Sequence, residues 1–118
     1  MKKKGTWYLK DLKSIKKNNL NVFSTFHCGG GSSMGYKLAG CNVLGGVEID
    51  KKMMSIYRAN HNPKYSYLMA IQDFKKTPLE EIPEELKSLD ILDGSPPCSV
   101  FSQAGKRQKR WGKEYFFR

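Results

Sequence analysis

The chain has 118 residues, enough for one small domain, and 39% of them are hydrophobic, as is usual for folded proteins. No apolar run is long enough to predict a transmembrane helix, and the N-terminus lacks the apolar core of a secretory signal. We therefore expect a cytoplasmic protein without a membrane partner. Three widely spaced cysteines exclude a disulfide framework. His27 beside Cys28, with His61 far along the chain, predicts no metal site.

The net charge of +10 is concentrated at the two ends of the chain. Residues 1–20 hold seven lysines against one aspartate, and residues 106–118 hold six basic residues against one glutamate. Cationic side chains displace counterions from phosphates, so this distribution favours a polyanionic partner. The alternative is two solvated ends, and it is slightly favoured for the N-terminal run. The C-terminal run follows a candidate catalytic loop, and there we favour function.

The first half of the chain alternates between helical and extended patterns. Residues 7–17 predict a short helix, and the alternating, β-branched residues 20–26 predict a strand. After a glycine cluster, a helix capped by Ser32 or Ser33 should run to about Ala39. Residues 42–49 predict a second strand that ends in acidic residues.

The second half continues the alternation. Residues 51–60 predict a helix, 66–71 a strand, 73–81 a polar loop, 83–88 a short helix and 89–92 a fourth strand. The side chains that we expect the first of these helices to bury are Met53, Ile56 and Tyr57. The alternation predicts an open, doubly wound α/β sheet, in which ligands bind beyond the carboxyl ends of the strands.

Two features of this edge predict a nucleoside cofactor. The consecutive glycines Gly29, Gly30 and Gly31 let the backbone approach a ligand closely. Glu48, 17 positions later, ends the second strand and suits a bond to ribose hydroxyls. The third glycine of a dinucleotide fingerprint is missing, because Met34 stands there. A cofactor with adenosine but no pyrophosphate fits better, and S-adenosylmethionine is such a molecule.

The third feature is the stretch LDILDGSPPCSVFS, residues 89–102. An apolar run, a turn and two stiff prolines lead directly to Cys98. This order suits a nucleophile held at the carboxyl edge of a sheet. A buried structural cysteine after an ordinary proline turn is the alternative.

Three segments together resemble the N-terminal part of the DNA (cytosine-5) methyltransferases: FHCGGGSSMGYKLAG, VEID and DILDGSPPCSVFS. The resemblance covers about residues 20–118, with residues 1–19 as a basic N-terminal extension. It implies a partial Rossmann-like methyltransferase sheet, S-adenosylmethionine as cofactor and DNA as partner. It also implies methyl transfer to C5 of cytosine through a covalent cysteine adduct, as in DNA methylation by restriction–modification systems.

The resemblance also assigns roles to single residues. Cys98 corresponds to the nucleophile, and Lys106, Arg107, Lys109 and Arg110 fall in the loop that closes over DNA. The residues that correspond to cofactor contacts are Phe26 and Ile49 for the adenine, Glu48 for the ribose, Gly29, Gly30 and Gly31 for the methionine part, and Pro97 beside the base pocket.

The sequence departs from the family pattern at several positions. Cys28 stands where the first glycine of the loop is expected, and Ser99 replaces a common glutamine. Ala70 replaces the acidic residue expected near the adenine, with Asp73 as the candidate replacement. The Glu-Asn-Val segment, the catalytic arginine segment and the target recognition domain are absent before Arg118.

These absences predict a truncated chain or one half of a split enzyme, with a second chain supplying the missing motifs. Two non-enzymatic alternatives stay open. One is an inactive remnant or binding half that needs a partner chain, and the other is a basic nucleic-acid-binding α/β protein.

Overall fold

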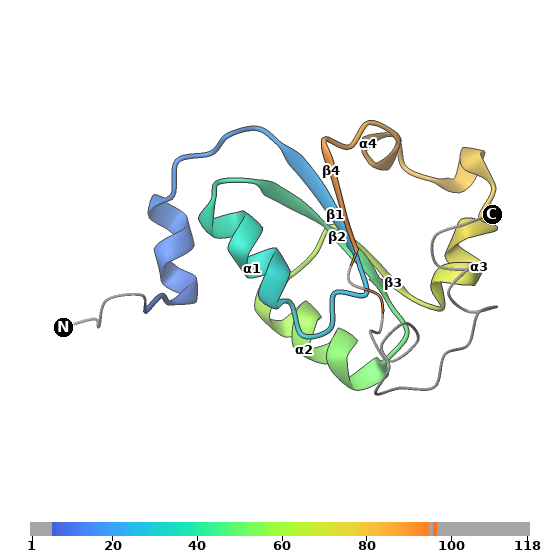
Figure 1. Cartoon of the computed structure of the whole chain (residues 1–118), viewed down its shortest axis with the longest axis horizontal. Coiled ribbons are helices and arrows are strands. Elements are labelled where there is room, and N and C mark those ends of the chain that lie inside the picture. Colours follow the sequence, from blue (N-terminus) through green and yellow to red (C-terminus); the bar gives the residue numbers. More distant parts are fainter. Residues whose placement is uncertain (1–5, 95, 97–118) are drawn as a thin grey trace, which may run out of the picture.

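A computed structural model of the chain describes residues 6–94 and residue 96. Four parallel strands form one twisted sheet in the order β3-β2-β1-β4 (Figure 1). The strands are β1 (Asn21–Thr25), β2 (Asn42–Glu48), β3 (Tyr65–Leu68) and β4 (Ile91–Gly94). The strand order reverses at β1, since β2 and β3 lie on one side of it and β4 lies on the other.

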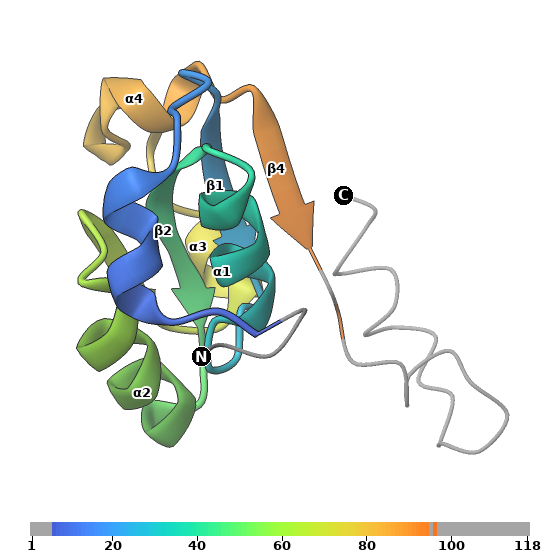
Figure 2. The same cartoon turned by 90° about the vertical axis from the view of Figure 1, so that its left-hand side faces the viewer.

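Helices cover both faces of this sheet. Figure 2 shows α1 in front of β1 and α3 behind the sheet, with β4 at one edge. The α-helices are α1 (Gly31–Leu38), α2 (Lys51–His61), α3 (Ile71–Lys75) and α4 (Glu84–Lys87), and the 3-10 helices are η1 (Leu9–Ser14) and η2 (Leu79–Glu81). This arrangement confirms the predicted doubly wound, Rossmann-like sheet for the part of the chain described.

The alternation of β1 divides the core between the two faces. Phe23 points toward α3, where its ring stacks on Phe74 with the ring centroids 5.7 Å apart. Ser24 points to the opposite face, toward α1. All three central residues of β1 are buried, as expected for a parallel strand covered on both sides.

A bulge separates the two halves of the β1–β2 pairing. Val22 pairs with Val43 but Phe23 pairs with Gly45, so the register shifts by one residue. Gly45 has a φ of 146°, and a Cβ there would collide with the carbonyl oxygen of Tyr65 on β3. Glycine at this position lets β2 and β3 approach closely.

Several predicted elements differ from the structure. The helix after the glycine cluster begins at Gly31 and has Gly30 at its N-cap, so the predicted cap by Ser32 or Ser33 was wrong. The helix predicted over 7–17 is only the 3-10 helix η1, because the apolar residues there are too few to bury one face. The strand predicted over 66–71 ends at Leu68, and the polar loop predicted over 73–81 was wrong. This region contains α3 and η2, since Phe74 packs against the sheet.

The buried face of α2 also differs from the prediction. Tyr57 is buried as expected, but Ile56 is 38% exposed, Met53 is partly exposed, and the second fully buried side chain is Met54. The helix therefore buries Met54 and Tyr57 in place of the predicted set.

On the face of the sheet that carries Phe23, β4 is less well covered than the central strand β1. Leu92 pairs in register with Phe23 and points to the same face, yet Leu92 is 68% exposed. Across the described ranges, no helix is long and apolar enough to span a membrane.

Replacing Gly45 with alanine should lower the free energy of unfolding by about 2–4 kcal/mol, because positive φ and the collision with Tyr65 both add strain. Gly35 is the matched control, since it lies in the middle of α1 with open space at the Cβ position. Gly35→Ala should raise stability by about 0.5–1 kcal/mol. Urea denaturation followed by circular dichroism measures both, and an unchanged midpoint for Gly45→Ala would contradict the strained register.

Candidate functional site

The carboxyl edge of the sheet is occupied by the glycine loop, residues 26–31, between β1 and α1. Phe26 and Cys28 both have positive φ, 55° and 51°, and the Phe26 N–H bonds to the Val47 carbonyl of β2. Cys28 therefore adopts the left-handed backbone that favours glycine, which is the residue that the resemblance leads one to expect there.

Glu48 holds this loop against the end of β2. Its Oε2 accepts a hydrogen bond from the Cys28 N–H at 2.9 Å, and its Oε1 accepts from the Ile49 and Asp50 N–H groups at 3.1 and 3.2 Å. The Glu48 residue is only 9% exposed. The carboxylate predicted to bind a ribose is thus fixed by three backbone donors at the edge where ligands bind.

The side chain of Asp50 continues this arrangement, because it accepts a hydrogen bond from Met53 N at 3.0 Å and caps the N-terminus of α2. The next residue after Glu48, Ile49, is 66% exposed and leaves a large apolar side chain beside the carboxylate. Phe26 is half-buried. An exposed apolar side chain next to a fixed carboxylate suits an adenosine, which has a flat apolar base and a polar sugar.

Gly30 lets the loop lie directly on the aromatic side chains of α2. It has a φ of 104°, and a Cβ there would collide with the His61 ring and lie 2.9 Å from Tyr57. Tyr57 stacks on His27 at 3.7 Å between centroids and lies against His61 at 4.7 Å. Although the two histidines are distant in sequence, both contact the ring of Tyr57.

The hydrogen bonds of these histidines define their tautomers. His27 Nδ1 donates to the Cys28 carbonyl at 2.8 Å, and His61 Nε2 donates to the Gly30 carbonyl at 3.0 Å. The other ring nitrogens, His27 Nε2 and His61 Nδ1, are buried without a partner among the described residues. Burial lowers the pKa of both imidazoles; Glu48 opposes this at His27, whereas Lys37 adds to it at His61.

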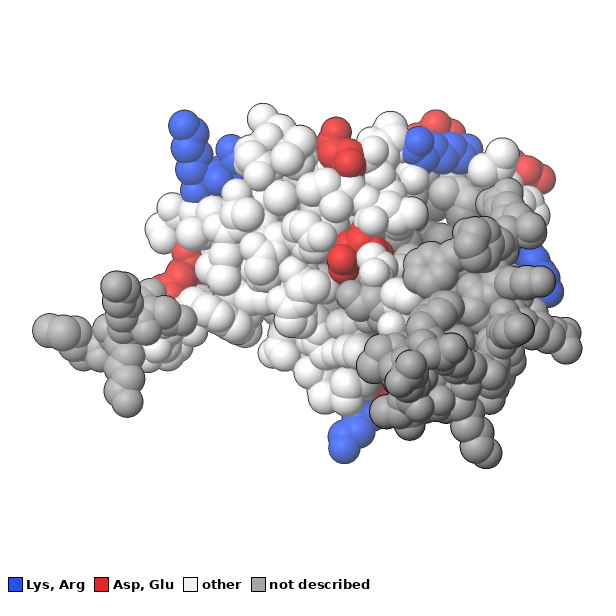
Figure 3. Space-filling view, viewed as in Figure 1, with Lys and Arg blue, Asp and Glu red and all other residues white. Residues whose placement is uncertain are grey.

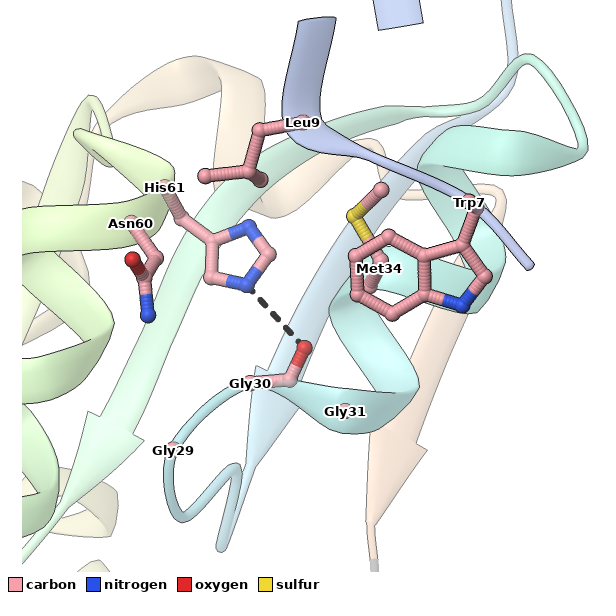
Figure 4. A pocket seen from close by; sticks show the side chains of 8 residues that line it. All are labelled: Trp7, Leu9, Gly29, Gly30, Gly31, Met34, Asn60 and His61. Atoms are coloured by element: carbon pink, nitrogen blue, oxygen red, sulfur yellow. Dashed lines mark hydrogen bonds between the residues drawn. The ribbon is translucent and has the colours of Figure 1, made fainter. Parts of the chain in front are cut away.

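A hollow of about 270 Å³ lies beside the glycine loop, on the side of η1 and the end of α2 (Figure 4). Its lining residues are Trp7, Leu9, Gly29, Gly30, Gly31, Met34, Asn60 and His61. Neither Glu48 nor Ile49 belongs to it. We therefore place the candidate site at the strand ends, where the fixed carboxylate lies, and not in this mostly apolar hollow.

Asp93, near the end of β4, is a further polar residue of this edge, to which the sequence pattern gave no role. Its carboxylate accepts hydrogen bonds from Ser24 Oγ at 2.6 Å, Ser32 Oγ at 3.1 Å and the Tyr36 hydroxyl at 3.3 Å. Its carbonyl accepts from Thr25 Oγ1 at 3.0 Å. The sequence signal was a charged residue at the end of an otherwise apolar strand.

The structure thus brings together part of the predicted site. The predicted residues that meet at the carboxyl edge are Phe26, Gly29, Gly30, Gly31, Glu48 and Ile49. Asp73 is exposed in the first turn of α3, next to Ala70, which precedes that helix. The other predicted residues lie outside the described part of the chain: Pro97, Cys98, Lys106, Arg107, Lys109 and Arg110.

Comparison with known proteins decides the family. The family model for C-5 cytosine-specific DNA methylases matches residues 20–115. The chain belongs to this family. Its relatives include the type II methyltransferases M.Sau96I of Staphylococcus aureus, 40% identical over 98 residues, and M.FnuDI of Fusobacterium nucleatum, 33% identical over 86 residues. No solved structure gives a significant match.

The chain spans only part of the length of these relatives. The matched regions cover 82% and 73% of this chain, but 22% of M.Sau96I and 23% of M.FnuDI. A third relative, M.HindV of Haemophilus influenzae, is 35% identical over 86 residues, which is 26% of its length. The matched segment therefore corresponds to about a quarter of each relative.

The two histidines predict how the stability of this chain depends on pH. They are the only histidines in the sequence, and other side chains rarely titrate between about pH 5.5 and 7.5. Because burial lowers their pKa from the ordinary 6.5, the unfolded chain takes up protons at a higher pH than the folded chain. The contribution of the two neutral imidazoles to the free energy of unfolding should be fully present above about pH 6.5, and it should be lost as the pH is lowered below that value.

Denaturant unfolding at a series of pH values measures this dependence. The double variant His27→Asn, His61→Gln keeps a side-chain amide donor near each ring donor and should give a flatter profile over the same range. An equally steep profile in the double variant would show that other groups cause the acid sensitivity.

Proposed function

We propose that this chain is the cofactor-binding and nucleophile-bearing part of a DNA cytosine-5 methyltransferase that uses S-adenosylmethionine. The observation that carries the proposal is the Glu48 carboxylate, fixed by three N–H groups beside the glycine loop at the carboxyl edge. Membership of the family supports DNA as the substrate.

The residues of this edge fit the cofactor. Glu48 would accept a hydrogen bond from a ribose hydroxyl at the one carboxylate lone-pair site that the three backbone donors leave free. Ile49 and Phe26 would contact the adenine, and the glycine loop, Gly29 to Gly31, would lie along the methionine part. The cofactor supplies an electrophilic methyl group when it is bound.

The proposed chemistry of this chain depends on Cys98. C5 of cytosine is a poor nucleophile. Addition of the Cys98 thiolate to C6 turns C4 and C5 into part of an enamine, and C5 then attacks an electrophilic methyl group. Once C5 has taken the methyl group, with S-adenosylhomocysteine as the leaving group, a general base would take the C5 proton, the Cys98 thiolate would leave C6, and the aromatic base would be restored. The thiolate form requires a lowered pKa or a nearby cation, and the base must leave the duplex to reach it.

Several basic residues follow Cys98 in sequence. We propose that Lys106, Arg107, Lys109 and Arg110 neutralise DNA phosphates, which positions the duplex without reading its sequence. Because M.Sau96I and M.FnuDI are more than four times as long as the matched segment, we also propose that methyl transfer needs further segments of the kind that they carry.

Replacing Glu48 with alanine should weaken binding of S-adenosylhomocysteine by roughly tenfold or more, because a hydrogen bond to a charged group contributes about 1.5–3 kcal/mol. Calorimetric titration measures the change. Glu80→Ala is the matched control, since Glu80 is an exposed carboxylate in η2, and it should leave the affinity unchanged.

Glu48 also holds the Cys28 N–H, so the melting temperature of the variant is measured alongside its affinity. A folded unmutated chain that binds no S-adenosylhomocysteine at millimolar concentration would refute the proposed cofactor site.

Cys98→Ser should abolish methyl transfer, because serine is a far weaker nucleophile than cysteine at neutral pH. The assay follows labelled methyl incorporation into cytosine-containing DNA, with the chain alone and with an added polypeptide that carries the remaining family segments. We expect transfer only in the presence of the added polypeptide. Transfer that survives Cys98→Ser would assign the nucleophile to another residue.

A further inference from the structure

Asp93 lies where the topology of the sheet opens a crevice. The strand order reverses between β1 and β4, and open α/β sheets bind ligands at such a point, beyond the carboxyl ends of the strands. Asp93 is the third of the four residues of β4 and pairs in register with Ser24 of β1. It is half-buried, and acidic atoms reach the surface over the carboxyl end of β4 in Figure 3.

Three hydroxyl groups fix this carboxylate. Ser24 is fully buried below it, whereas Ser32 and Tyr36 belong to the helix that follows the glycine loop. The two carboxylate oxygens offer about four lone-pair sites, and these hydroxyls fill three of them. One acceptor site therefore remains, and the oxygens have a fixed position relative to α1.

The charge of Asp93 is not compensated within the described residues. All three side-chain donors are neutral, and no described Lys, Arg or His forms an ion pair with it. Its negative field helps to raise the pKa of Tyr36, after the larger effect of burial, and also acts on Tyr57. A half-buried anion without a cationic partner favours binding of a positively charged group.

We propose that Asp93 binds the ammonium group of the amino-acid part of the cofactor. This inference rests on the proposed function and adds a binding residue to it. Glu48 ends the strand on one side of β1, and Asp93 lies near the end of the strand on the other side, level with Gly46 and so two register positions before Glu48. The backbones of these two strands are about 10 Å apart, so the two carboxylates flank the glycine loop. A ligand that crosses the loop meets Glu48 with its ribose and Asp93 with its amino acid.

The chemistry of the site selects the ammonium over the other cation of S-adenosylmethionine. A sulfonium has no hydrogen to donate, whereas an ammonium donates three hydrogen bonds and suits the remaining acceptor site of a carboxylate already held by hydroxyl donors.

The test compares two ligands and two variants by calorimetric titration. S-adenosylhomocysteine carries the ammonium, and 5′-methylthioadenosine lacks the amino-acid part. Asp93→Asn should weaken the binding of S-adenosylhomocysteine roughly tenfold or more and leave the affinity for 5′-methylthioadenosine unchanged. Asp90→Asn is the matched control, because Asp90 holds the Asn21 N–H at the opposite end of β4, and it should change neither affinity.

A second measurement needs no variant. Acetylating the amine of S-adenosylhomocysteine removes its charge and should weaken binding to the unmutated chain, with Asp93→Asn removing most of that difference. Three results would overturn the role of Asp93 while leaving the proposed function standing. They are an equal loss of affinity for both ligands in Asp93→Asn, no loss for either ligand, and an affinity of the unmutated chain that acetylation of the ligand does not change. Failure of the unmutated chain to bind either ligand would overturn both proposals.

Discussion

The buried carboxylate of Glu48 is bonded at the same time to the end of β2 and to the loop after β1. Cys28 donates to one oxygen, and Ile49 and Asp50 donate to the other. Such charge-assisted bonds are stronger than bonds between neutral groups, so the loop and the strand end form one rigid unit. The left-handed conformations of Phe26 and Cys28, which are unfavourable for these residues, persist because this unit requires them.

The glycine loop is supported from below by aromatic rings and from the side by hydroxyl groups. Tyr57 and the two imidazoles support its backbone, and Ser32 and Tyr36 attach the helix that follows it to β4. The support from α2 uses ring stacking and one hydrogen bond, from His61 to the Gly30 carbonyl, whereas the support from β4 uses an anion. The loop is thereby fixed without a metal ligand or disulfide among the described residues, and its surface toward the strand ends carries a carboxylate on each side.

Much of this arrangement follows from patterns in the sequence. The apolar runs and glycine positions predicted β1, α1, β2, α2 and the edge where Glu48 lies, because strand and helix periods are local properties. The pattern gave no sign of α3, since its helix depends on Phe74 packing against Phe23, 51 positions away in the numbering. The roles of His61 and Asp93 were also hidden, because each contacts the glycine loop or its helix only after a crossover brings distant strands together.

The pairing of β1 with β4 has a consequence for how the chain folds. Ser24 and Asp93 are 69 positions apart, and their strands become neighbours only after the intervening strands and helices have been placed. Closing so long a loop is entropically costly before its contacts form, so parallel pairings of this kind are intrinsically slow. The β1–β4 half of the ligand edge is thus expected to assemble late in folding. A ligand that bridges β2 and β4 would bind only the completed sheet, and would thereby favour the completed fold over its precursors.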